Sequence, residues 1–440
     1  MKQHLTSIFA LAFVAAAACA NQQAPANEMS DADRSEMGSR GEQIAGALSA
    51  FDGEYDVSPA AMATAVLNDD GKPVGLLAYE SPVDAVKAGD MAAFVAAMKS
   101  TAMRDGEESP FASAISSIDA AAAGDIDRAL ETVQVTVDSD DMTIVGGFLE
   151  AWYLALDGRF EEAIDAHRKV GTRLPGLTGD LSLAALLEVA GREEEALAVY
   201  AAITPTEITA PEHNFDPQSL VYGHVKLVVA RQALLLRSLG RVDEAKALYA
   251  RLAAAEPEQA VSFAAALNQI ETGRGIDEEP MDAREAFSRS LADYSLALAY
   301  QRVIRSAFSG QRAEGFDDTK AAFDQLALLI DPSNEDLRLA VISDLYDETF
   351  YDAAIHVATV APEQTAGLKL ALAQSYVRLG DLDTAREALD SAIELADEDE
   401  QLATSSNAML IYALLDDQQQ ATDLAESTPD LAETDAEKAS

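Results

Sequence analysis

A glycine that returns at nearly constant spacing is the feature that most restricts the fold of this 440-residue chain. Gly124, Gly158 and Gly191 are 34 and 33 residues apart, Gly240 follows after 49, and Gly273 comes 33 residues later. A period of about 34 residues is typical of a unit made of two short helices, and several such units must stack to bury a common core. The spacing therefore predicts an array of helical hairpins.

Small residues keep a fixed register with the five clearest of these glycines, the fifth being Gly380. An alanine stands five residues after each glycine and a small residue seven before it: Ala129, Ala163, Ala196, Ala245 and Ala385, with Ser117, Ala151, Ala184, Ala233 and Ala373. The glycine can adopt the left-handed conformation that ends a first helix. The small residues let the two helices of a hairpin approach where they cross. Aromatic residues are only 6% of the chain, which also favours alanine-rich stacked helices over a β-sandwich.

This pattern resembles the tetratricopeptide repeat family, whose repeats also carry a bulky residue where Leu154, Leu187 and Leu236 stand here. The resemblance implies an all-α fold, an α-solenoid of stacked helical hairpins wound into a superhelix. It covers residues 111–272, with an insertion at 204–218, and in degenerate form residues 273–425. In the second part Lys320 replaces the expected alanine and Thr349 the expected glycine.

The chain begins with features of export. Lys2 and the apolar run after it predict a signal peptide over residues 1–20, followed by a polar tether over 21–50. Ala18 and Ala20 fit one cleavage site. Alternatively, Cys19 and the three alanines before it resemble a bacterial lipobox, although Ala16 stands where leucine is usual. Lipidation of Cys19 would place the protein in the periplasm on the outer membrane, anchored through its acyl chains.

Two further segments flank the predicted array. Residues 51–110 are expected to be an N-terminal helical region, with one weak hairpin over 81–100 and a possible strand near the turn signal at Asp70-Gly71. Residues 426–440 are expected to be an acidic C-terminal tail.

Charge narrows the range of partners. The chain has 76 acidic and 31 basic residues, a formal net charge of −45. Such a chain repels phosphate backbones, so nucleic acid is not expected as a partner, whereas a protein or peptide carrying basic groups is. The alternative is that the acidic residues only keep the protein soluble.

Catalytic and metal-binding motifs are missing from the sequence. The five histidines form no HExxH pattern, and there is no GxSxG, GxxxxGK[ST] or GxGxxG motif. We therefore expect no enzyme activity, no cofactor and no metal. An enzyme with an unrecognised site in residues 204–218 or 50–110 remains the alternative.

The family resemblance also implies a binding surface on the concave face of the superhelix. Carried onto this sequence, its positions are Phe148, Trp152, Leu234, Arg237, Phe263, Leu267, Gln374 and Arg378. The alternative for Phe148, Trp152, Phe263 and Leu267 is packing between helices. The expected function is a protein-binding scaffold or adaptor of the cell envelope. A dedicated regulatory or assembly subunit of an envelope enzyme or secretion complex is the second possibility.

Overall fold

The structure is a computed structural model that describes residues 66–67, 73–75, 82–101, 109–205, 208, 217–256, 267–273, 281–309, 317–397, 401–415 and 419–425. Within these ranges the regular secondary structure is helical except for one antiparallel pair of short strands, β1 (Val66–Leu67) and β2 (Pro73–Gly75). The all-α prediction is thus confirmed. The signal peptide, Cys19, the tether, most of the 204–218 insertion, Phe263 and the acidic tail lie outside the described residues.

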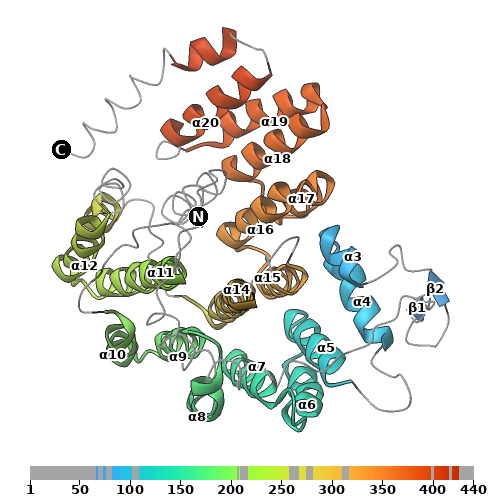
Figure 1. Cartoon of the computed structure of the whole chain (residues 1–440), viewed down its shortest axis with the longest axis vertical. Helices are drawn as coiled ribbons and strands as arrows, with labels where there is room; N and C mark the ends of the chain where they lie inside the picture. Colours follow the sequence, from blue (N-terminus) through green and yellow to red (C-terminus); the bar gives the residue numbers. More distant parts are fainter. Residues whose placement is uncertain are drawn as a thin grey trace.

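Most helices pack against the next one along the chain (Figure 1). They are α3 (Pro82–Lys87), α4 (Met91–Thr101), α5 (Pro110–Ala122), α6 (Ile126–Val137), α7 (Thr143–Leu156), α8 (Phe160–Val170), α9 (Thr178–Val189), α10 (Glu193–Ile203), α11 (Pro217–Ser238), α12 (Val242–Ala255), α14 (Ala283–Ser309), α15 (Asp318–Ile330), α16 (Glu335–Asp347), α17 (Tyr351–Thr359), α18 (Ala366–Leu379), α19 (Leu382–Leu395) and α20 (Gln401–Leu414). The predicted hairpin over 81–100 corresponds to α3 and α4.

The repeated glycines end the first helix of each pair, as predicted. Their φ angles are all positive: 82° at Gly124, 76° at Gly158, 69° at Gly191, 75° at Gly240 and 81° at Gly380. A β-carbon at any of these five would meet no other atom within 4 Å. The glycines are therefore required by the left-handed backbone and not by lack of space.

The small residues lie where the helices meet, also as predicted. Every alanine five residues after a glycine and every small residue seven before it has 0% of its surface exposed. Side chains this short let the backbones of the two helices approach closely.

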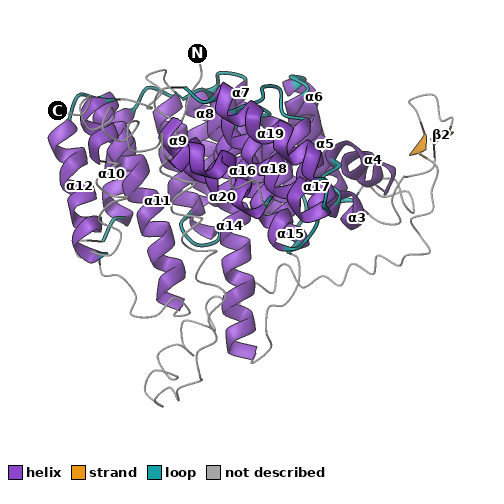
Figure 2. Cartoon of the chain, turned by 90° about the horizontal axis from the view of Figure 1, so that it is seen from above, coloured by secondary structure: helices purple, strands orange, loops and turns teal. Residues whose placement is uncertain are grey.

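Two rows of helices are visible in Figure 1. Helices α5, α7, α9 and α11 form an inner row, and α6, α8, α10 and α12 form an outer row. Figure 2 shows that the long helices α11 and α14 extend past their neighbours at one end.

The buried residues form two hydrophobic cores. The first runs from α3 to α15, and the second from the end of α15 to the end of the described chain. We call residues 82–330 the first block and residues 335–425 the second block. The two cores meet within α15, because Leu328 belongs to the second core and Ile330 to the first. The first core extends this far because α14 packs on α9 and α7, and α15 packs on α3, α4 and α5.

Candidate protein-binding surfaces

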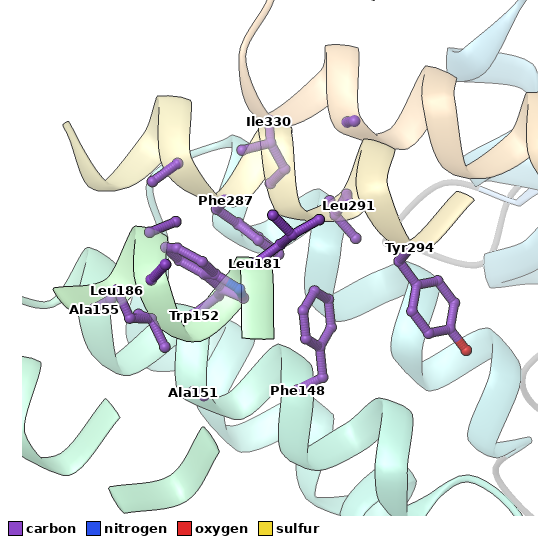
Figure 3. Packing of buried hydrophobic residues seen from close by; sticks show 14 of the residues in the cluster. Phe148, Ala151, Trp152, Ala155, Leu181, Leu186, Phe287, Leu291, Tyr294 and Ile330 are labelled. Atoms are coloured by element: carbon purple, nitrogen blue, oxygen red, sulfur yellow. The ribbon is translucent and has the colours of Figure 1, made fainter. Parts of the chain in front are cut away.

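Helix α14 occupies the inner side of the first block, where the sequence predicted a binding surface. The ring of Phe148 on α7 stacks on Tyr294 of α14 at 5.8 Å between centroids, and Trp152 stacks on Phe287 at 5.7 Å (Figure 3). The Nε1 atom of Trp152 donates a hydrogen bond to Oγ of Ser182 on α9 at 3.0 Å. The aromatic contacts tie α14 to α7, and α14 packs on α9 as well.

Phe148 and Trp152 are therefore core residues, which corrects their prediction as partner-binding positions. Their side chains are 1% and 0% exposed, so no partner can reach them. The register was right, because both face the inner side, but the chain covers that side with its own helix. Large aromatic side chains gain most by being buried, and α14 supplies the apolar surface that buries them.

A buried ion pair holds the same helix to α11. Arg231 donates two hydrogen bonds to the carboxylate of Asp293 on α14, with N–O distances of 2.5 and 2.8 Å. The two side chains are only 7% and 6% exposed. Close by, Glu188 on α9 accepts a hydrogen bond from the Tyr200 hydroxyl at 2.6 Å. Burial raises the pKa of the Glu188 carboxyl.

Arg284 fixes the beginning of α14. It donates hydrogen bonds to the carbonyl oxygens of Ala122 and Ile330, at 3.2 and 2.8 Å, which lie at the carboxyl ends of α5 and α15. A cation at the carboxyl end of a helix is favourable because the unpaired carbonyl groups there carry partial negative charge.

Three more of the predicted positions belong to the first block: Leu234 and Arg237 lie on α11, and Leu267 follows α12. Leu234 and Arg237 are half-buried on α11, and Leu267 packs against the first core. A β-carbon at Gly273 would lie 1.6 Å from Nη2 of Arg237, so the guanidinium rests on the glycine backbone. None of the three is presented freely to solvent.

Gln374 and Arg378 differ from the other predicted positions, because both are exposed. They lie one turn apart on α18, which packs between α16 and α20 in the second block. The guanidinium carbon of Arg378 lies 5.7 Å from the ring centroid of Tyr346 and 5.6 Å from that of Tyr351. The two rings meet edge to face at 5.2 Å.

The guanidinium of Arg378 is held in place on one side only. Its Nε donates a hydrogen bond to the Tyr351 hydroxyl at 3.1 Å. Among the described residues no carboxylate forms an ion pair with it, and the groups that act on it are the two tyrosines. Arginine and tyrosine held in this way are typical of the residues that dominate binding energy in protein interfaces.

An outer groove, which the sequence analysis did not predict, lies between α10 and the α11–α12 pair. It measures about 500 Å³, and its apolar lining consists of Leu197, Ala198, Ala201, Leu236, Ala247 and Leu248. At one end Arg241 already bonds Glu194 and Glu244. The lining of the groove is mainly apolar and alanine-rich. Its small residues look like ordinary helix-packing positions in the sequence.

The described residues contain no group of three or more His, Cys, Asp or Glu side chains that could hold a metal ion. None of the helices that the structure describes is long and apolar enough to cross a membrane.

Compared with known proteins, the sequence matches no protein-family model and no curated protein.

Proposed function

We propose that this protein is an exported scaffold or adaptor of the tetratricopeptide type, which binds another protein through the second block. The helix pairs, the left-handed glycines and the buried small residues support a tetratricopeptide-like superhelix. The observation that carries the binding proposal is the exposed Arg378, held against two tyrosine rings with no carboxylate partner among the described residues. Gln374 extends the same face of α18 by one turn.

The first block contributes differently to this function. Because α14 covers its inner side, we assign it the role of a rigid support and leave partner recognition to α16 and α18. Arg378 suits a carboxylate or carbonyl group of the partner, while the acidic surface of the rest of the chain favours basic groups around it. A partner segment of mixed charge fits both conditions.

Affinity capture from a membrane extract tests the role of Arg378. The Arg378→Ala variant should bind the captured partner at least about tenfold more weakly than wild type, because truncating an interface arginine of this kind commonly costs more than 1 kcal/mol. Arg128→Ala is the matched control, since Arg128 is also exposed but lies on α6, in the first block. Equal retention of the partner by both variants would remove this surface from the proposal. The number of captured proteins separates an adaptor from a dedicated subunit.

Lipidation of Cys19 is tested by fractionation. The Cys19→Ser variant should move from the membrane fraction to the soluble periplasmic fraction, because it has no acyl chains to insert in the bilayer. Cys19 is the single cysteine of the chain, so no other thiol can substitute for it. A wild-type protein that is already soluble would contradict the lipoprotein proposal while leaving protein binding open.

A further inference from the structure

One histidine fills a core position that other repeats fill with side chains that stay uncharged near neutral pH. Nine residues after the five helix-ending glycines stand five buried residues, which are Val133, His167, Tyr200, Tyr249 and Leu389. Valine and leucine do not titrate, and tyrosine loses its proton only at about pH 10. His167 is thus the single member of this set whose charge can change near neutral pH.

The ring of His167 is buried without a polar contact. The side chain is 1% exposed, and neither Nδ1 nor Nε2 has a hydrogen-bond partner among the described residues. Burial, and to a lesser extent the positive charge of Arg168, lower the pKa of His167 from 6.5 to about 4. The imidazole is therefore neutral in the folded protein at neutral pH. A proton on it would be a buried charge without a counter-ion.

The elements that pack on α8 offer no such counter-ion. They are α7, the short 3₁₀ helix Gly171–Arg173 and α9. Their charged residues do not act on the His167 ring, and neither do the other charged residues of α8: Glu150 and Asp157 of α7, Arg173 of the 3₁₀ helix, Asp180 and Glu188 of α9, and Glu161, Glu162, Asp165 and Lys169 of α8. The carboxyl end of α8 favours a cation, but burial outweighs this effect at His167.

Two glycines couple the ring to α9. A β-carbon at Gly171 would lie 2.7 Å from Cε1 of His167, and one at Gly179 would lie 2.0 Å from the carbonyl oxygen of Gly171. The backbone of Gly171 therefore touches both the ring and the first turn of α9, and neither contact leaves space for a side chain. A ring that leaves its site displaces Gly171 and, with it, the beginning of α9.

We propose that His167 is an acid-sensitive switch in the first block: when the ring gains a proton it leaves the core, and α9 is released from α8. α9 also packs on α14, and its Ser182 accepts a hydrogen bond from Trp152, so the release loosens the inner side of the first block. The switch does not depend on binding at Arg378, which lies in the second block.

The direction of the pH response follows from the lowered pKa. The unfolded chain binds a proton at His167 at about pH 6.5, whereas the folded protein resists it. Stability is therefore lost as pH falls below about 6.5, and this loss levels off near pH 4. Burial raises the pKa of Glu188, which acts in the opposite direction, but it does so equally in wild type and in variants of His167.

Urea denaturation of the full chain at about pH 7.5 and about pH 5 tests the switch. Between these pH values the unfolding constant of wild type should rise at least about tenfold more than that of His167→Leu, because only wild type gains this proton on unfolding. Leucine is chosen because Leu389 fills the equivalent position. His356→Leu is the matched control and should respond like wild type, since His356 is exposed on α17.

Trp152, the single tryptophan, reports the movement of α9 through its bond to Ser182. Without urea, its emission should change at a higher pH in wild type than in His167→Leu. The proposal is overturned by an equal pH response of stability or of emission in these two proteins. It is also overturned if NMR shows the wild-type ring titrating at about pH 6.5, the value of a free histidine, with unchanged emission. If His167→Leu does not fold, His167→Tyr replaces it, and the NMR titration needs no variant.

Discussion

Thr349 shows how strongly the backbone register of the repeat constrains a single residue. It takes the place of the helix-ending glycine and is the only non-glycine residue with a positive φ, 66°, in the described part of the chain. Its amide bonds the carbonyl of Tyr346, and the next amide, of Phe350, reaches back to Leu345 at 2.8 Å. The same pair of bonds surrounds Gly158, so the turn is kept although the residue type is unfavourable.

Replacing Thr349 by glycine should therefore stabilise the protein. A β-branched residue in the left-handed region is strained, and we expect Thr349→Gly to raise the free energy of unfolding by about 1 kcal/mol. The reciprocal Gly380→Thr variant, at an equally open turn, should lower it by a similar amount. Urea denaturation measures both. A Thr349→Gly variant that is less stable than wild type would show that the threonine side chain makes a compensating contact.

Lys320 is the other departure from the repeat pattern, and only the structure explains it. Its Nζ lies 2.7 Å from the carboxylate of Asp324 and also contacts Asp344 on α16. Burial alone would lower the pKa of Lys320, but the two carboxylates outweigh it and raise the pKa. Lys320 therefore links α15 to α16 by an ion pair, from a position where the repeat pattern has alanine.

At the scale of helices, exposed ion pairs join one helix of the outer row to the next. Each of three arginines directly follows a helix-ending glycine and bonds the glutamate three residues later: Arg159 with Glu162, Arg192 with Glu195, and Arg241 with Glu244. Arg192 also bonds Glu161, and Arg241 also bonds Glu194, each in the preceding pair. Exposed pairs of this kind contribute little stability, but they link α8 to α10 and α10 to α12.

The buried pair of Arg231 and Asp293 contributes much more to the packing of α14. Asp293→Ala should lower the free energy of unfolding by about 3 kcal/mol, because it leaves a buried guanidinium without its carboxylate. Arg231→Met combined with Asp293→Leu should be close to neutral, since neither charge is then buried.

The chain offers its own reporter for this experiment. Trp152, the single tryptophan, stacks on Phe287 of α14, so its fluorescence follows the loss of α14 during urea denaturation. A double variant as unstable as Asp293→Ala would mean that packing around the pair, rather than an unpaired charge, determines the loss.

Across the whole molecule, the net charge of −45 opposes compaction. Raising NaCl from about 0.05 M to about 0.5 M should raise the melting temperature by roughly several degrees, because the Debye length falls and distant carboxylates repel each other less. Salt also weakens the exposed Arg–Glu pairs, but these are few and individually worth little. A melting temperature that falls with NaCl would show that attractive pairs outweigh the repulsion. A neutral solute at the same concentrations is the control.

Much of the local structure could be predicted from the sequence. The glycine turns, the paired helices and the buried small residues depend on contacts within a repeat or between adjacent helices, and such contacts leave a periodic pattern. Of the seven predicted binding positions that the structure describes, however, only Gln374 and Arg378 are exposed. The pattern placed Phe148 and Trp152 on the right side of their helix without indicating what covers that side.

Only the tertiary structure decided which element covers this side of α7. Helix α14 lies far along the chain from α7, yet Tyr294 and Phe287 meet Phe148 and Trp152 there. The sequence determined which face of each helix is apolar, because that follows from local spacing. Which apolar face packs against which other one depends on how the chain returns through space.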